Sequence, residues 1–150
     1  LRRVRMSKSP GDSSEQRKAE KWLVNALSEK LGVTLTKKKW SLDRGSWIEL
    51  DGFCESPLVL CEAWAHIGPP KSAQKNKVMT DAFKLQFANT LVKGDGKRIL
   101  LFADHDAAAH FQGKSWMAQC LNEYNIIVKI IELPPKLKTK VLKAQKRQYR

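Results

Sequence analysis

The sequence predicts an α/β domain in which helices cover both faces of a central mixed sheet, a three-layer α/β/α sandwich. Helical and strand periodicity follow the order α-β-β-β-α-β-α-β along the chain. Short turns join the first three strands and favour antiparallel pairing, whereas a later, uninterrupted apolar strand is typical of a buried parallel position. With 150 residues, 42% of them hydrophobic, the chain has the core and the length for one domain of ordinary size.

The first expected element is a helix that begins at Ser14. Residues 1–13 are rich in Arg, Lys, Ser, Gly and Pro and are expected to form a flexible basic segment. Ser13 or Ser14 provides the N-cap, and Gly32 ends the helix. Glu20 interrupts the apolar side of this helix, three residues before Leu23, so its carboxylate is expected to face inward. The apolar stripe consists of Ala19, Leu23, Ala26, Leu27 and Leu31.

Three strands are expected next, at residues 33–40, 47–53 and 58–66, with turns at 43–45 and 56–57. Alternation places every second residue of a strand on the same face. In the second strand one face carries Trp47, Glu49, Asp51 and Phe53, and in the third one face carries Leu60, Glu62, Trp64 and His66.

The second half of the chain alternates helices and strands. We expect a helix at 72–93 ended by Gly94, a buried strand at 98–103, a helix at 104–124 and a strand at 126–133. The 104–124 helix is expected to break near Gly113, with Ser115 as a new cap and Asp104 or Asp106 as the first cap. Pro134-Pro135 is expected to end the domain, which spans residues 14–133, before a basic C-terminal tail at 134–150.

Positive charge dominates the composition. Lys and Arg number 28 against 15 Asp and Glu, which gives a net charge of +13 and a pI near 9.9. Such a surface favours a polyanionic partner, most often nucleic acid, because neutralising phosphates releases counterions. Three cysteines in non-metal spacing and the lack of an apolar run of about 18 residues predict no disulfide framework and no membrane span. The expected location is a reducing compartment, the cytoplasm.

Two acids interrupt apolar strand sequences. Asp51 lies in Trp47-Ile48-Glu49-Leu50-Asp51-Gly52-Phe53, and Glu62 lies in Leu58-Val59-Leu60-Cys61-Glu62-Ala63-Trp64. An ionised carboxylate in an apolar setting costs several kcal/mol unless a cation or hydrogen bonds compensate for it. The pair therefore indicates a metal site, a paired base or a catalytic use.

The order of elements and these acids resemble the PD-(D/E)xK nuclease superfamily, the restriction-endonuclease-like fold, over residues 14 to 133. In such enzymes an acid at the end of the second strand and one in the third bind divalent cations. The resemblance implies that Asp51 and the tripeptide Glu62-Ala63-Trp64 take these places, and that Glu20 on the first helix is a further metal ligand. Oxygen ligands with open water positions suit Mg²⁺ or Mn²⁺. Glu49 remains an alternative ligand.

The signature lysine is missing, because its position holds Trp64. Some members of the superfamily supply the lysine from the following helix, where Lys77 and then Lys84 are the candidates, beside Gln74 and Asp81. His66 is a further candidate for a base or a water-orienting group.

The resemblance implies a metal-dependent nuclease that cleaves DNA, or with lower preference RNA, with a homodimer as an option. The alternatives are an inactive nucleic-acid-binding module of the same fold, which uses its basic arms and surface Trp residues, and a basic assembly protein. The residues expected to contact nucleic acid are Lys37, Lys38, Lys39, Arg44, Lys71 and Gln74.

Overall fold

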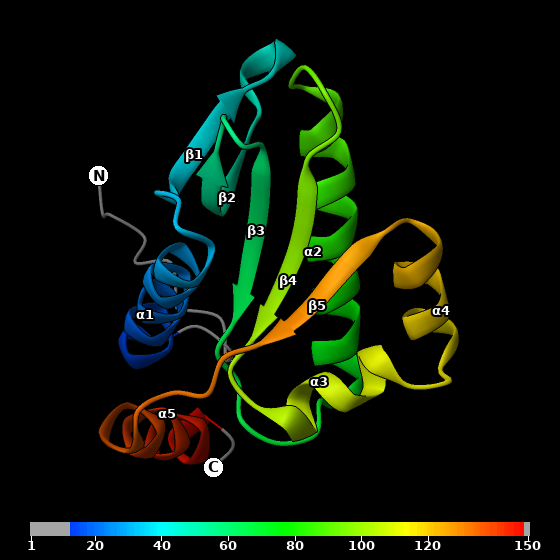
Figure 1. Cartoon of the computed structure of the whole chain (residues 1–150). Coiled ribbons are helices and arrows are strands. Elements are labelled where there is room, and N and C mark those ends of the chain that lie inside the picture. The colour runs from blue at the N-terminus through cyan, green and yellow to red at the C-terminus, as the bar shows by residue number, and fades with distance from the viewer. Residues whose placement is uncertain (1–12, 149–150) are drawn as a thin grey trace, which may run out of the picture.

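A computed structural model of the chain describes residues 13–148. The flexible basic segment expected at 1–13 therefore lies almost wholly outside the described residues. Five strands form one sheet, and helices lie on both sides of it (Figure 1). In chain order the elements are α1 (Ser14–Leu31), β1 (Thr36–Ser41), the 3-10 turn η1 (Asp43–Gly45), β2 (Trp47–Cys54), β3 (Val59–Trp64), α2 (Ser72–Thr90), β4 (Lys97–Phe102), α3 (His105–Gln112), α4 (Trp116–Glu123), β5 (Ile126–Ile130) and α5 (Pro135–Gln148).

The sheet is mixed, and its spatial order β1-β2-β3-β4-β5 is the order of the strands in the chain. The pairs β1–β2 and β2–β3 are antiparallel, as their short connections predict. β4 is parallel to both β3 and β5, which confirms the expectation from its uninterrupted apolar sequence. A parallel pair needs a long crossover connection, and helices provide it in both cases.

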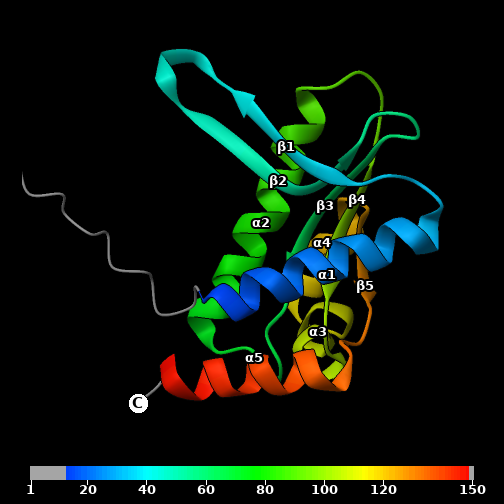
Figure 2. The same cartoon turned by 90° about the vertical axis from the view of Figure 1, so that its left-hand side faces the viewer.

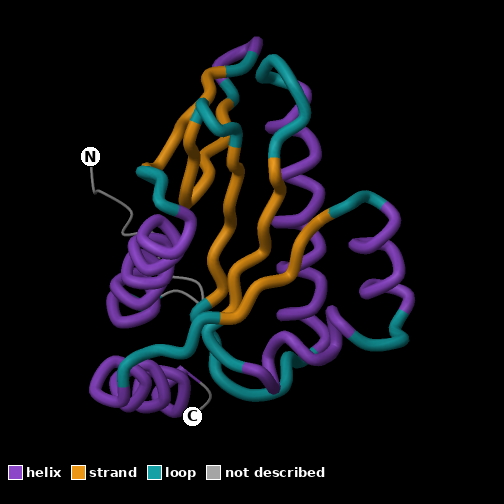
Figure 3. The backbone as a smooth tube through the Cα atoms, viewed as in Figure 1, coloured by secondary structure: helices purple, strands orange, loops and turns teal. Residues whose placement is uncertain are grey.

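Two apolar clusters hold helices against the two faces of the sheet. On one face, Leu60 and Trp64 pack in a cluster with residues of α2, α3 and α4. On the other face, Val59, Cys61 and Ala63 pack with residues of α1 and α5. The two helical layers are visible in Figure 3, and the arrangement is compatible with a three-layer α/β sandwich.

The caps of the helices follow their sequence signals. The Ser13 side chain accepts a hydrogen bond from the Gln16 backbone N–H, and Gly32 ends α1 in the left-handed conformation at φ 66°. The predicted break near Gly113 is confirmed, because α3 ends at Gln112 and Ser115 caps α4. Asp104 caps α3 by accepting from Ala107 N–H at 3.2 Å. The expectation that α2 extends to Gly94 is wrong, since the helix ends at Thr90.

The C-terminal residues differ most from the expectation. The sequence predicts a tail at 134–150, but Pro135–Gln148 is a helix that packs on the face covered by α1. Val141 is fully buried there, and Gln145 binds both backbone groups of Ile67, accepting from N–H at 2.8 Å and donating to C=O at 3.0 Å. The dense positive charge of this segment obscured its apolar positions 137, 141 and 144, whose spacing is that of an amphipathic helix.

A β-bulge in β2 changes which side chains share a face. Thr36 pairs with Phe53 but Lys38 pairs with Leu50, so β2 contains one extra residue at Asp51–Gly52. Ile48, Leu50 and Phe53 consequently pack in the same cluster as α2. Glu49, between Ile48 and Leu50, points to the opposite face, so the expectation that Glu49 shares a face with Asp51 is wrong.

Among residues 13–148, no helix combines the length and the apolar character that crossing a membrane requires.

Candidate active site

Asp51 and Glu62 meet where β2 and β3 separate. The two strands pair only through Gly52–Cys61, Phe53–Leu60 and Cys54–Val59. At the next position, the Asp51 backbone N–H donates to Glu62 Oε1 at 2.9 Å, and the Ala63 N–H donates to Asp51 Oδ2 at 2.9 Å. Each carboxylate thus replaces a backbone carbonyl as the acceptor. This exchange of bonds fixes both acids at the fork between the strands, on the face covered by α2.

Lys84 of α2 completes this cluster. Its Nζ lies 2.8 Å from Glu62 Oε2 and 4.0 Å from Asp81 Oδ1. The Glu62 side chain is only 5% exposed, whereas that of Lys84 is 29% exposed. The ammonium therefore lies against a buried carboxyl group while part of its side chain still reaches solvent.

Burial and negative charge destabilise the ionised form of Glu62. Burial and the nearby Asp51 raise the pKa of Glu62 to about 8, although Lys84 acts in the opposite direction. Burial also raises the pKa of Asp81. The pKa of Lys84 is raised as well: burial opposes this shift, but Glu62, Asp81 and Asp51 together outweigh it. Three acids surround one lysine, so ionising all three would leave an excess of negative charge, which another cation would offset.

The structure places Lys84, and not Lys77, on Glu62. Lys77 is exposed and its Nζ lies 5.4 Å from the centre of the Trp64 ring. The order of preference in the sequence prediction, Lys77 before Lys84, is therefore reversed by the contacts. α2 runs back along the sheet after β3 ends, so later helix residues face earlier strand residues: Lys77 faces Trp64, and Lys84 faces Glu62.

Asp81 was not predicted as a site residue. Its side chain is 16% exposed and lies beside Lys84. The available signal was its position on the polar stripe of α2, between Lys77 and Lys84. Helical spacing places Lys77, Asp81 and Lys84 on one side of α2, but it does not show that this side of the helix faces the carboxyl groups of Asp51 and Glu62.

His66 belongs to the loop that follows β3. It is buried, its Nε2 lies 3.1 Å from Gln74 Nε2, and its ring stacks on Trp64 with centroids 5.4 Å apart. Burial lowers the pKa of His66 to about 4, so the ring is neutral near pH 7. Gln74 Oε1 in turn accepts from Lys71 N–H at 2.8 Å. These contacts hold His66 between the start of α2 and the end of β3.

Glu20 is not brought into a group with Asp51 and Glu62. It is half-buried on α1, which packs on the opposite face of the sheet from Glu62. Over residues 13–148, no cluster of three or more His, Cys, Asp and Glu side chains is close enough to hold a metal ion. The acids that the structure gathers are the pair Asp51 and Glu62, with Asp81 beside Lys84.

The residues predicted to contact nucleic acid fall into two groups. Lys37, Lys38, Lys39 and Arg44 are exposed on the β1–β2 hairpin, and Lys71 is exposed at the start of α2. Gln74 is only 8% exposed and is engaged by His66 and Lys71. The expectation that Gln74 contacts nucleic acid therefore conflicts with its burial.

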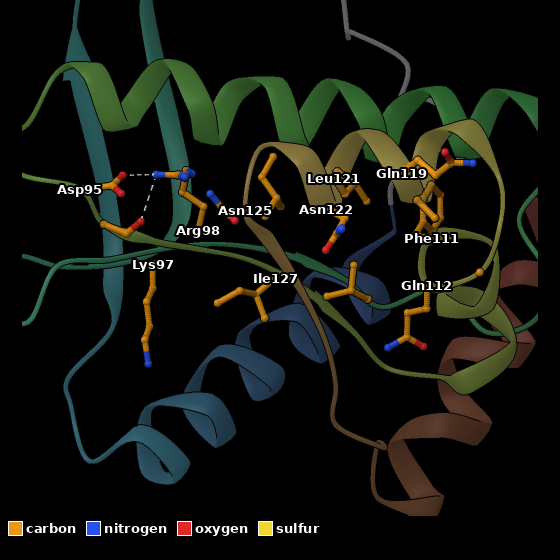
Figure 4. Close-up of a pocket in the computed structure, with 15 residues that line it drawn as sticks. Asp95, Lys97, Arg98, Phe111, Gln112, Gln119, Leu121, Asn122, Asn125 and Ile127 are labelled. Carbon is orange, nitrogen blue, oxygen red and sulfur yellow. Dashed lines mark hydrogen bonds and ion pairs between the residues drawn. The ribbon is translucent and has the colours of Figure 1, made fainter.

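A cavity of about 850 Å³ lies elsewhere, between β4 and β5 of the sheet and α3 and α4 (Figure 4). Phe111, Leu121, Ile127 and Arg98 are among its lining residues. Arg98 donates to Asp95 Oδ1 at 2.6 Å and to the Tyr124 carbonyl at 3.0 Å, and so joins the loops that precede β4 and β5. The candidate active site is formed instead by β2, β3 and α2.

Comparison of the chain with protein-family models, with curated proteins and with solved structures finds no match.

Proposed function

We propose that this protein is a metal-dependent nuclease of the PD-(D/E)xK type that hydrolyses phosphodiester bonds of DNA. The observation that carries the proposal is the fork between β2 and β3, where Asp51 and Glu62 exchange bonds with each other's strands and the Lys84 ammonium lies 2.8 Å from Glu62. In this proposal Lys84 replaces the signature lysine whose position Trp64 occupies.

The donor set fits a hard divalent cation. Asp51 and Glu62 would hold Mg²⁺ or Mn²⁺, because Mg²⁺ is commonly bound by one or two carboxylates together with waters and substrate phosphate oxygens. The raised pKa of Glu62 supports the same assignment, since a bound cation would offset the cost of ionising this carboxyl group. When bound, the metal supplies a nucleophilic water and neutralises charge on the phosphoryl group.

The protein side chains have separate roles in the proposal. Asp51 and Glu62 are held at the fork by backbone N–H groups, so little reorganisation is needed when substrate binds. Lys84 is positioned by Glu62 and Asp81 to orient the attacking water or to face the negative phosphate. His66 is a positioning residue, because its ring contacts Trp64 and Gln74.

Cleavage of plasmid and labelled linear DNA, with Mg²⁺, with Mn²⁺ and with a chelator, tests the proposal. Asp51→Asn, Glu62→Gln and Lys84→Met are each expected to reduce metal-dependent cleavage at least about 100-fold, the loss typical of one charge-stabilising group. Glu49→Gln is the matched control, because Glu49 is on the same strand but on the opposite face.

Undiminished cleavage by Glu62→Gln would overturn the proposal. Loss of cleavage in Glu49→Gln alone would move the metal ligand to the other face of β2. Salt-sensitive DNA binding without metal-dependent turnover would select the inactive binding module instead.

A further inference from the structure

Trp47 is exposed at a place where packing does not require it. Its ring is 56% exposed at the start of β2, while the neighbouring Ile48 and Leu50 provide the residues of this strand that pack toward α2. Lys39 Nζ lies 4.3 Å from the centre of the Trp47 ring. This contact holds a cation against the aromatic surface and restricts the orientation of the ring. The side chain is thus pre-positioned and still accessible to a ligand.

The surrounding hairpin is strongly basic. Four exposed basic residues, Lys37, Lys38, Lys39 and Arg44, accompany one exposed acid at its turn, Asp43. A second lysine–tryptophan contact, with Lys38 Nζ 5.7 Å from the Trp40 ring, lies on the other face of the hairpin, where Trp40 packs with Phe53. Aromatic rings interleaved with cations are the combination used to hold a phosphate backbone and stack bases.

Strand β2 of the hairpin also carries Asp51 of the candidate active site. Figure 2 shows the far end of the hairpin projecting away from the rest of the sheet. Trp47 and Asp51 lie on the same strand, four residues apart, a separation of about 13 Å at ~3.3 Å per residue. The acids lie on the face of the sheet covered by α2, whereas Trp47 lies on the opposite face of β2, which it shares with Glu49 and Lys39.

We infer that the β1–β2 hairpin binds a single-stranded segment of nucleic acid, with an unpaired base stacked on Trp47 and its phosphates facing Lys37 and Lys39. The inference rests on the proposed function for the class of ligand, and it adds the class of substrate: DNA with an unpaired region. A base presents its flat face to an aromatic ring only when it is unpaired or at an end, whereas a duplex presents mainly phosphates to the lysines.

Binding measured without metal tests the inference separately from catalysis. The probes are a labelled oligothymidylate of about 20 nucleotides, which exceeds the roughly 4–16 nucleotides that one such surface covers, and a labelled blunt duplex of the same length. Fluorescence anisotropy in chelator gives both affinities at several salt concentrations. The variants are Trp47→Ala, Trp47→Phe and Lys39→Gln. Trp116→Ala is the matched control, since Trp116 is 67% exposed on α4.

Trp47→Ala is expected to weaken oligothymidylate binding about 5- to 150-fold, the contribution of one stacked base, and to leave duplex binding unchanged. Trp47→Phe retains an aromatic face and is expected to keep most of the affinity. Lys39→Gln is expected to weaken binding to both probes and to reduce the salt dependence. Trp116→Ala is expected to change neither affinity. Equal urea midpoints for the variants and the wild type establish that the fold is intact.

Equal losses on both probes, or no loss with Trp47→Ala, would overturn the inference. A protein that cleaves DNA but binds oligothymidylate independently of Trp47 would refute the inference alone. Trp47-dependent binding without any metal-dependent cleavage would refute the nuclease proposal and retain the binding site. A protein that binds neither probe would refute both.

Discussion

Glu62 is expected to make the stability of this protein depend on pH. Burial and Asp51 raise the pKa of Glu62 in the folded state to about 8 from the ordinary value of 4.5. The folded state therefore holds this proton at pH values where the unfolded state has lost it. The resulting stabilisation is complete below the unfolded pKa and is lost as the pH rises through the folded pKa. Glu62→Gln removes the titrating group and this dependence.

The size of the effect follows from the shift. For one group that titrates at 4.5 when unfolded and at about 8 when folded, the free energy of unfolding falls by roughly 3.5 kcal/mol between pH 5 and pH 8. The Glu62 side chain is only 5% exposed, so solvent screens its charge interactions little. Asp81 also has a raised pKa and interacts with Glu62, so the difference between the two proteins measures Glu62 together with its effect on Asp81.

Urea unfolding of the metal-free proteins at several pH values between 5 and 8 measures this difference. The free energy of unfolding of the wild type should fall more steeply with pH than that of Glu62→Gln. Glu123→Gln, a substitution of an exposed acid on α4, should retain the wild-type slope. If the proposed metal site exists, Mg²⁺ should flatten the wild-type slope, because it binds the ionised carboxylates. Equal slopes for the wild type and Glu62→Gln without metal would refute the reasoning.

Two further predictions concern Lys77 and α5. Lys77→Gln removes the exposed cation above Trp64. In steady-state cleavage assays this substitution should raise KM for DNA and leave kcat nearly unchanged. A loss confined to kcat would show instead that Lys77 acts in the chemical step. Val141→Ala should lower the free energy of unfolding by about 1.5–3 kcal/mol, because Val141, on α5, is fully buried against the cluster that includes residues of α1. Leu142 lies on the same helix and is 37% exposed, so Leu142→Ala should lower the free energy of unfolding much less. Equal decreases for the two variants in urea unfolding would mean that α5 does not pack as described.

Local patterns predicted most of the fold correctly. The cap at Ser13, the stop at Gly32 and the new start at Ser115 depend on side chains and backbone conformations within a few residues. The parallel position of β4 followed from its unbroken apolar sequence, because only a strand buried on both faces tolerates one. These features are encoded over short stretches of chain.

The failures of prediction involve contacts between separate elements of the fold. α5 was expected to be a tail because its positive charge is conspicuous, whereas its packing depends on apolar residues of α1 and on the Ile67 backbone. Gln74 was expected at the surface because polar side chains usually are exposed, but it is buried against His66. The partners of α5 lie far away in the sequence, whereas His66 is close to Gln74 in sequence but belongs to the loop before α2.

For the candidate site, the sequence by itself determined which acids are unusual. Asp51 and Glu62 interrupt apolar strands, and the cost of burying a carboxylate marks them without any knowledge of the fold. Only the tertiary structure decided how these acids are arranged and which lysine contacts them. The bulge in β2 and the separation of β2 from β3 bring the acids together, and the direction of α2 selects Lys84 over Lys77. Burial cost is a property of one residue in its local sequence, whereas register and helix direction depend on contacts between segments.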